Sequence, residues 1–437
     1  MGQRGENDSS GLPKDDEGTW KGGFFVGQGG NGVIHYWVNV DEFQKVRDRM
    51  VIKDDWVSDS NEEPEAYRGL YEDLVKKGMD FGINPDRPGK AKIEERFNRE
   101  AYLQAMLTDP DSRDSATTVP LRGIRKGHDH EWRIPNGDTS KKLYTHWRFY
   151  MDLFHAGDLH GILASHIVGE GDNKKPIPEP IPEPFIWCVF TCIAEALAQS
   201  ERVVQTRPNA RQEQDEVITF VDMKPPNMLL YVTRRDKYPV YPKPLLSDFG
   251  AAHILYKEDP RQNRNHEKPY SHGATVGFFA PEMVKRDIVF KRDKLAIERP
   301  LHSWTNVWQT GRTIESMMHL RTVVREDQDE ICIGDCPIKD KDPIDIKGFP
   351  DFKYSDDLID LVWRCQRFEP EQRPTTTELL ELIQERALQH SRGMDTWADE
   401  RNIPQGCAIN FSAGSGPNTV ADSFARPKTK DEMDGYW

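Results

Sequence analysis

The sequence contains no apolar run long enough to cross a membrane. The best candidate, residues 185–198, is shorter than the roughly 20 apolar residues that a spanning helix needs, and it contains Glu195. The chain begins Met1-Gly2, like a myristoylation site, but Glu6 stands where serine or threonine is required. No positively charged and apolar signal peptide follows. These absences predict a soluble intracellular protein, cytoplasmic or nuclear, that does not bind membranes.

Cysteine is scarce, with six residues in a chain of 437. Cys188 and Cys192 would share one face of a helix, and Cys332 and Cys336 lie in a loop rich in glycine and aspartate. Neither pair is accompanied by the second pair of ligands that a structural zinc site requires. We therefore expect reduced thiols with a packing role, in preference to a metal site.

Positive charge is also in deficit. Lysine and arginine total 59 against 73 aspartates and glutamates, which gives a formal net charge of −14. An acidic chain is poorly suited to non-specific nucleic-acid binding, although a local basic groove could still bind a charged substrate. The length allows one large core or two medium ones.

The most informative stretch is 220–230, in which an acid, a base and an amide stand at fixed offsets before a short apolar run. Phosphoryl transfer needs a carboxylate to accept the proton of the attacking hydroxyl, a cation near the migrating group and an oxygen ligand for a metal. Asp222, Lys224 and Asn227 could take these three roles. The alternative is a surface turn, in which the same residue types are common. The pattern resembles the catalytic loop of eukaryotic protein kinases, and its lysine resembles the serine/threonine type.

A glycine-rich stretch lies earlier in the chain, where Gly27, Gly29 and Gly32 are spaced so that a backbone hairpin could approach phosphates. The same spacing would serve a dinucleotide-binding fold, but that fold needs a helix directly after the glycines. Apolar residues alternate from Ile34 to Val40, which predicts a strand instead. The stretch therefore resembles the kinase loop that covers the nucleotide phosphates, with a plain glycine-rich turn as the alternative. The resemblance implies ATP contacts from the three glycines and from Ile34.

Two charged residues further along would complete a phosphate site. Lys53 ends the apolar strand 50–53, and Glu100 lies in a helix predicted over residues 91–107. The resemblance implies that Lys53 contacts the α and β phosphates and pairs with Glu100, for which Glu95 is the competing candidate. Either residue could also have an ordinary role, at a strand end or as a solvated acid on an amphipathic helix.

The stretch 147–158 has the pattern of a strand that runs into a connection, and it resembles the hinge between the two kinase lobes. An ordinary strand and turn is the alternative. The resemblance implies backbone contacts with adenine at the hinge, a side chain at the back of the pocket, a carboxylate near the ribose and an apolar contact just after the catalytic loop. The residues implied are Asp152 and Phe154, Met151, Asp158, and Leu229.

Asp248-Phe249-Gly250 matches the metal-binding triplet of the family. A carboxylate at this position suits Mg2+, which prefers oxygen ligands, and an aspartate in a glycine-bounded turn is the alternative. Ala280-Pro281-Glu282 closes an activation segment that begins at residue 251. The resemblance implies that Thr275, near the end of this segment, braces the catalytic loop.

Two later residues would support the larger lobe. The resemblance implies that Arg373 pairs with Glu282. Asn306 lies in a stretch, 304–311, that resembles the central helix of the large kinase lobe, at a position where the family usually has aspartate. We therefore expect a structural role for all three residues.

The order of these motifs carries the resemblance, which covers roughly residues 22–390. It implies an α+β, bilobal protein-kinase fold with a small β-rich lobe over about 21–151, including one main helix, and a larger helical lobe over about 155–390. The termini, 1–20 and 391–437, are expected to be mostly disordered. Further expected features are insertions near 54–90, 109–142 and 200–216, a polyproline-like stretch over 177–184, and helices over 185–199, 358–368 and 376–390.

Three residues depart from the family pattern, because Phe220 and Val221 replace a His-Arg pair and Asn306 replaces aspartate. Val221 cannot receive a phosphate from the activation segment, so the usual switching by phosphorylation is not expected. None of the departures removes a group that would touch nucleotide, metal or the transferring phosphate. The sequence therefore predicts a serine/threonine kinase that uses ATP and Mg2+ and acts on a protein hydroxyl, without a nucleic-acid partner. The alternatives are a kinase-fold scaffold with little turnover and, less favoured by Ala280-Pro281-Glu282, a small-molecule kinase.

Overall fold

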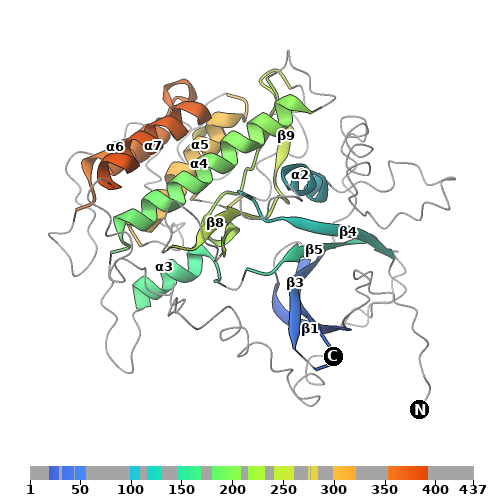
Figure 1. The fold of residues 1–437 in the computed structure, drawn as a ribbon. Coiled ribbons are helices and arrows are strands. Elements are labelled where there is room, and N and C mark those ends of the chain that lie inside the picture. The colour runs from blue at the N-terminus through green and yellow to red at the C-terminus, as the bar shows by residue number, and fades with distance from the viewer. Residues whose placement is uncertain are drawn as a thin grey trace. The chain divides into compact units, whose positions relative to one another are not determined.

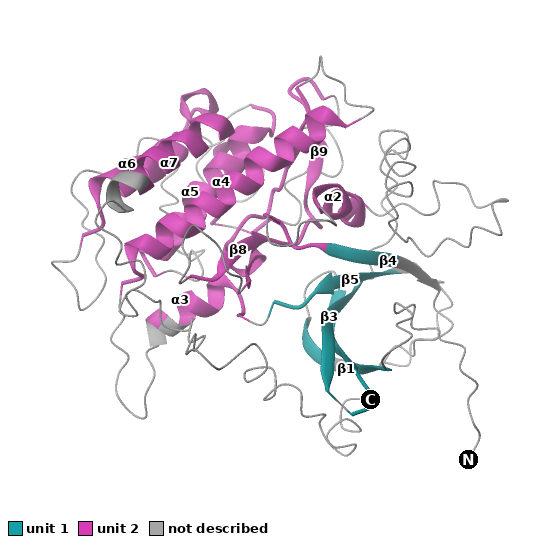
Figure 2. Ribbon diagram, viewed as in Figure 1, with its two compact units in different colours: residues 1–98, 121–155, 409–437 teal, residues 99–120, 156–408 magenta. Residues whose placement is uncertain are grey.

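The computed structural model describes residues 19–28, 32–43, 45–55, 99–108, 116–128, 145–154, 156–168, 180–207, 215–231, 241–259, 274–275, 277–283, 299–320 and 353–391. The chain divides into two compact units (Figure 2). The sheet unit comprises residues 1–98, 121–155 and 409–437, and the helical unit comprises residues 99–120 and 156–408. An antiparallel sheet and several helices together place the protein in the α+β class, as expected.

Five antiparallel strands build the sheet unit, in the order β1-β2-β3-β5-β4 (Figure 1). The predicted alternation in β2 is confirmed, because Tyr36, Val38 and Val40 are buried together. The strand predicted over residues 50–53 is longer than expected toward its N-terminus. This strand, β3, begins at Val46, which pairs with Val40. The strands are β1 (Thr19–Gln28), β2 (Gly32–Val40), β3 (Val46–Asp55), β4 (Leu121–His128) and β5 (Thr145–Asp152).

The register of β3 places Lys53 between Ile34 on β2 and Phe149 on β5. The Lys53 ammonium lies 5.7 Å from the centroid of the Phe149 ring, within the distance of a cation–π contact. Gly32, at the start of β2, is required by packing, because a Cβ there would lie 2.3 Å from the Asp54 carbonyl oxygen. Sheet pairing therefore explains both the position of the lysine and one of the three glycines.

The helical unit is arranged around α4, which is buried along most of its length and packs against α5, α7 and β8 (Figure 1). The helices of this unit are α2 (Arg99–Leu107), α3 (Leu159–Val168), α4 (Glu183–Thr206), α5 (Ser303–Met318), α6 (Asp356–Cys365) and α7 (Thr376–Ser391). Its short strands are β6 (Val217–Thr219), β7 (Met228–Tyr231), β8 (Lys243–Leu246) and β9 (His253–Leu255), and its 3₁₀ turns are η4 (Pro225–Asn227), η6 (Pro281–Met283) and η7 (Pro370–Gln372).

Helix α4 is longer than the sequence predicted at both ends. It starts at Glu183, because a proline such as Pro184 is tolerated in the first helical turn, where its missing N–H has no intrahelical partner. It continues to Thr206, because Ser200 and Val204 extend its buried face. The segment near 200–216, which we expected to be an insertion, therefore begins as part of the central helix.

Helix α2 is grouped with the helical unit, whereas the sequence placed it in the smaller lobe. Arg99 Nη2 donates to the Gly250 carbonyl at 2.8 Å, and Gln104 Nε2 donates to the Val119 carbonyl at 2.9 Å. These bonds join α2 to segments that belong to the helical unit. The first part of the predicted helix, residues 91–98 with Glu95, lies outside the described residues, as do most of the expected insertion near 54–90 and of both termini. The expected insertion near 109–142 is wrong for residues 121–128, because they form β4 of the five-stranded sheet.

Helix α7 agrees closely with its predicted range, α6 begins two residues and ends three residues earlier than predicted, and α5 continues to Met318, well beyond the predicted stretch 304–311. Ser355 caps α6, because its hydroxyl accepts the Leu358 N–H at 3.2 Å. The expectation of reduced thiols is confirmed for the three described cysteines, which are buried: Cys188, Cys192 and Cys365. None of the helices that the structure describes is long and apolar enough to span a membrane.

Candidate active site

Two short antiparallel pairs bring the predicted catalytic loop and the predicted metal-binding turn together. In the first, β7 pairs with β8 so that Met228 faces Leu246. The residues just before and after these strands are then neighbours, and the Ser247 N–H donates to the Asn227 carbonyl at 2.9 Å. In the second, β6 pairs with β9. The two ladders therefore enclose the stretches 220–227 and 247–252, and Asp248 comes directly after the residue bonded to Asn227.

Asp222, Lys224 and Thr275 form a closed set of hydrogen bonds. Asp222 is 8% exposed, and its Oδ2 lies 2.7 Å from Lys224 Nζ. Its Oδ1 accepts the Thr275 backbone N–H at 2.9 Å. Lys224 Nζ also donates to Thr275 Oγ1 at 2.6 Å. The structure thus brings together the three residues that the sequence assigned to catalysis, although Thr275 lies far along the chain from the other two.

Asn227 and Asp248 are the predicted metal ligands. Asn227 Nδ2 donates to the Asp222 carbonyl at 2.8 Å, so the amide oxygen is the atom that remains for a cation. Asp248 is exposed and adopts a φ of 58°, a left-handed conformation that is uncommon outside glycine, asparagine and aspartate. Within the described ranges, no cluster of three or more His, Cys, Asp or Glu side chains could hold a metal ion. A cation here would need further oxygen ligands from its substrate or from water.

Helix α5 supports the loop from below through Asn306, which is 1% exposed. Asn306 Oδ1 accepts the Phe220 N–H at 2.9 Å, and its Nδ2 donates to the Ile218 carbonyl at 2.7 Å. Only a side chain that both donates and accepts can satisfy these two backbone groups. The asparagine therefore fits its site as a neutral amide, where an ionised aspartate would face the Ile218 carbonyl.

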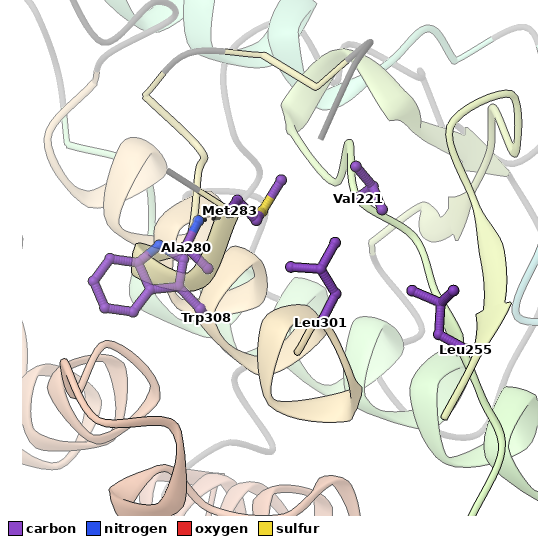
Figure 3. Packing of buried hydrophobic residues seen from close by; sticks show 6 residues of the cluster. All are labelled: Val221, Leu255, Ala280, Met283, Leu301 and Trp308. Carbon is purple, nitrogen blue, oxygen red and sulfur yellow. Dashed lines mark hydrogen bonds between the residues drawn. The ribbon is translucent and has the colours of Figure 1, made fainter. Parts of the chain in front are cut away.

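Val221 has a strained backbone, with a φ of 68°. This conformation is unusual for a β-branched residue and costs about 1–3 kcal/mol. The side chain is completely buried in a cluster that also contains Leu255, Ala280, Met283, Leu301 and Trp308 (Figure 3). Burial of a valine side chain contributes about 1.5–3 kcal/mol, which is enough to offset the strain. The ring of Phe220, the residue before Val221, lies 5.7 Å from the Phe249 ring. The stretches 220–227 and 247–252 therefore also pack against each other through aromatic side chains.

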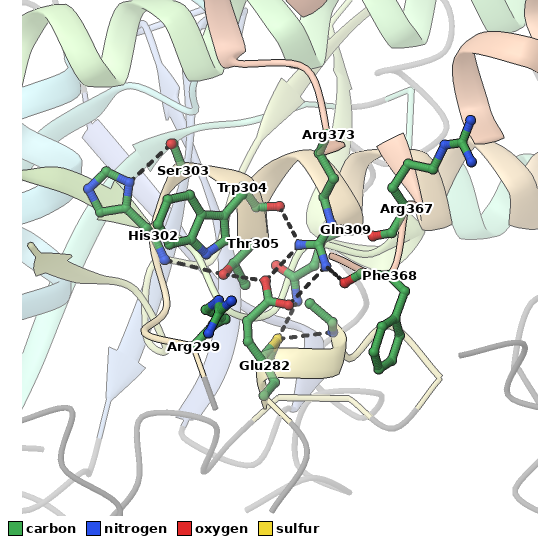
Figure 4. Close-up of polar contacts among 12 residues, drawn as sticks. Glu282, Arg299, His302, Ser303, Trp304, Thr305, Gln309, Arg367, Phe368 and Arg373 are labelled. Carbon is green, nitrogen blue, oxygen red and sulfur yellow. Dashed lines mark hydrogen bonds and ion pairs between the residues drawn. The ribbon is translucent and has the colours of Figure 1, made fainter. Parts of the chain in front are cut away.

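Glu282 and Arg373 form the predicted ion pair, and both side chains are fully buried. Arg373 Nη1 and Nη2 donate to the two Glu282 oxygens at 2.8 Å and 3.0 Å (Figure 4). The remaining guanidinium N–H groups donate to the carbonyls of Arg367, Trp304 and Phe368. All donors of this buried cation are satisfied, which is the condition under which such a pair is tolerated.

The N-terminus of α5 is bound through His302 to Asp215, which lies two residues before β6. Its Nε2 lies 2.8 Å from the Asp215 carbonyl, which can only accept, and its Nδ1 lies 3.1 Å from Ser303 Oγ. Burial lowers the pKa of His302 below its ordinary value of 6.5, because the charged ring would lose its hydration. The neutral ring therefore belongs to the folded state of this part of the helical unit.

The predicted nucleotide residues are divided between the two units. Asp152 is bound by Arg122, which also donates to Asp48 at 2.6 Å. Asp158 Oδ1 accepts the Gly161 N–H at 2.8 Å and so caps α3, a role that the sequence did not suggest. The predicted pair of Lys53 with Glu100 joins residues of different units and stays a prediction. In the sheet unit, Met151 and Phe154 are half-buried and Gly27 lies in β1, whereas Gly29 is outside the described residues. In the helical unit, Leu229 pairs with Asp158, and Glu100 is buried in α2.

Sequence reasoning missed Gln309, which is completely buried in α5. Its Nε2 donates to the Val221 carbonyl, and its Oε1 accepts the Met223 N–H at 3.4 Å. The available signal was its position three residues after Asn306, which puts the two amides on the same helical face. The amides therefore hold the backbone on both sides of Asp222.

Comparison with known proteins adds no relative to this description. A scan against protein-family models finds none that matches the chain, and a search of curated proteins finds none that is similar.

Proposed function

We propose that the chain is a protein serine/threonine kinase that transfers the γ-phosphoryl group of ATP to a protein hydroxyl with the help of Mg2+. The observation that carries this proposal is the hydrogen-bonded set of Asp222, Lys224 and Thr275. This set supplies a buried carboxylate and an ammonium group at one point, and Asn227 lies beside them, with its Nδ2 bonded to the Asp222 carbonyl. Catalysis of phosphoryl transfer rests mainly on positioning and on charge stabilisation, and these groups offer both.

Each member of the set has a separate role in the proposal. Asp222 accepts or orients the proton of the incoming hydroxyl. Lys224, held between Asp222 and Thr275, stabilises negative charge on the group in transfer. Thr275 fixes both side chains, and because it lies at the end of the activation segment, it connects the chemistry to the segment expected to bind the protein substrate.

Asn227 and Asp248 would hold the Mg2+ ion in this proposal. Asn227 offers an amide oxygen and Asp248 an exposed carboxylate. Mg2+ is usually bound by one or two protein oxygens, with phosphates and water completing its shell, so these two side chains would be enough. When bound, the ion would neutralise charge on the phosphates.

The proposal includes the bilobal arrangement of the kinase fold. The sheet unit would be the smaller lobe, with the glycine-rich loop and Lys53, and the helical unit would be the larger lobe, with the catalytic loop and Asp248. It also includes the ATP contacts expected from the hinge around residues 151–158.

Transfer of labelled phosphate from ATP to a panel of proteins tests the function directly. Asp222→Asn keeps the size of the side chain and removes its basicity, so phosphoryl transfer should fall by about 10²–10⁴-fold while nucleotide binding stays near normal. Asp356→Asn, the same change at an exposed position of α6, is the matched control and should leave transfer unchanged.

Three results would contradict the proposal. Equal transfer by wild type and Asp222→Asn would indicate a contaminating kinase, and absence of transfer by wild type with nucleotide still bound would favour the scaffold alternative. Phosphotyrosine as the main product would contradict the assignment of Lys224 to a serine/threonine loop.

A further inference from the structure

Helix α5 directs three polar side chains toward the same part of the helical unit. Asn306, Gln309 and Arg312 follow one another at intervals of three residues, which places them on one helical face. Asn306 binds the backbone of residues 218 and 220. Arg312 Nε donates to the Gly277 carbonyl at 2.9 Å. The first side chain thus holds the catalytic loop, and the last holds the closing segment, which we define as residues 274–275 and 277–283.

Gln309 stands between them and contacts both. Its Nε2 donates to the Val221 carbonyl and lies 3.4 Å from the Phe278 carbonyl, while its Oε1 accepts the Met223 N–H at 3.4 Å. The same Nε2 lies 3.7 Å from Met283 Sδ. The amide is 0% exposed, so water cannot replace these partners without a structural change. One buried side chain therefore bonds the residues on both sides of Asp222 and also the closing segment.

We propose that Gln309 is a positioning residue that couples the catalytic loop to the closing segment. Its consequence for catalysis rests on the proposed kinase function, but the coupling itself does not. Asp222 and Thr275 meet where the loop and the closing segment touch, through the bond from the Thr275 N–H at 2.9 Å. Lys224 also bonds Thr275 across this contact, and Gln309 provides a further connection between the same two stretches from the side of α5. Without it, the left-handed Val221 loses the donor on its carbonyl, and only the direct bonds of Asp222 and Lys224 to Thr275 then hold the loop against the closing segment.

The chemistry of the side chain supports this assignment. The site presents two carbonyl oxygens and one N–H group, so its occupant must donate and accept at the same time. Among uncharged side chains that reach this far from the helix axis, glutamine meets that requirement. Methionine has a similar volume and a similar preference for helices but can make none of the bonds, which makes Gln309→Met a clean removal.

Hydrogen exchange measured by mass spectrometry tests the coupling in the full-length chain. In Gln309→Met, peptides that cover 217–224 and 274–283 should both exchange about tenfold faster, as expected for loss of a buried hydrogen bond. Thr313→Val is the matched control, because Thr313 is completely buried on α5 and its hydroxyl donates within the helix, to the Gln309 carbonyl at 2.9 Å. It should leave both peptides near wild-type rates. If Gln309→Met does not fold, Gln309→Asn, whose amide is one methylene too short, serves as the second variant.

Kinetics then separate positioning from general stability. Gln309→Met should lower kcat by about 10- to 100-fold and leave the KM for ATP within about twofold, because displacement of catalytic groups by about 1 Å costs up to about that factor. Combining it with Thr275→Val should cost less than the product of the two single effects, since both act on the same contact.

The outcomes are separable from those for the proposed function. Faster exchange in both peptides of Gln309→Met, with Thr313→Val unchanged, supports the coupling even if the wild type transfers no phosphate. Exchange that rises in only one peptide, or equally in Thr313→Val, overturns it. If the wild type is an active kinase and kcat is unchanged in Gln309→Met, the positioning role is also overturned.

Discussion

Removing one partner of the Glu282–Arg373 pair should destabilise the helical unit by several kcal/mol. Both side chains are 0% exposed, and the Cζ atom of Arg373 lies 4.9 Å from the Trp308 ring centroid. In the wild type, Thr305 Oγ1 donates to Glu282 at 2.9 Å. Glu282→Gln keeps the shape of the side chain and this bond, but it leaves a buried cation without its counter-charge. Breaking a buried pair from one side costs about 3–5 kcal/mol.

Arg373→Met should cost at least as much. It leaves the Glu282 carboxylate without a partner cation, and it also removes the donors that satisfy the carbonyls of Trp304, Arg367 and Phe368. The double variant should be less damaged than the sum of the two single variants, by about 2 kcal/mol or more, because neither charge then remains alone.

Urea unfolding followed by tryptophan fluorescence measures these effects, since Trp308 lies directly under the guanidinium. With a slope of about 3 kcal/mol per molar urea, the midpoint for Glu282→Gln should fall by about 1–1.7 M. Glu371→Gln is the matched control, because Glu371 pairs with Arg299 at 2.9 Å on the surface, and exposed pairs contribute about 0–1 kcal/mol. Equal shifts for Glu282→Gln and Glu371→Gln, or additive losses in the double variant, would refute the reasoning.

Three further results are expected. ATP with Mg2+ should raise the melting temperature by binding the folded state, and Lys53→Met and Asp248→Ala should reduce that rise; wild type that shows no shift at saturating nucleotide would contradict the proposed site. Phosphatase treatment should change activity little, because Val221 cannot receive an activation-segment phosphate; a large loss that rephosphorylation restores would count against this. The lowered pKa of His302, caused first by burial, means that its contribution to stability is present above about pH 6.5 and is lost as the pH falls through the lowered folded-state value. His302→Asn should flatten this acid-side slope in unfolding measurements, and an unchanged slope would exclude His302 as its cause.

Local sequence patterns determined which elements form. Alternating apolar residues specify β2, because a strand turns successive side chains to opposite faces, and Tyr36 and Val38 are buried as the alternation requires. The nearly continuous apolar run of α4 specified a buried helix for a similar reason. The sequence did not determine where α4 ends, because its extension to Thr206 depends on the burial of Ser200 and Val204 in the folded chain.

The chemistry of the candidate site was also readable in the sequence, as residue types at fixed offsets. Asp222, Lys224 and Asn227 stand in one short stretch, and local spacing alone puts them near each other. The pairing of Glu282 with Arg373 could be expected only through the resemblance to kinases, because 91 residues separate them in the chain. The resemblance thus supplied long-range contacts that spacing cannot.

Only the tertiary structure decided how the backbone of the loop is held. The left-handed conformation of Val221 is unfavourable for its residue type, so no local rule predicts it, and it exists because packing and a bond from Gln309 outweigh its strain. In the sequence, nothing distinguishes Gln309 from other polar residues on a helix. Its bond partner Val221 lies 88 positions earlier in the chain, and only the fold brings the two residues together. Sequence sets the chemistry that is present at each position, whereas the orientation of buried polar groups depends on which partners the rest of the chain brings to them.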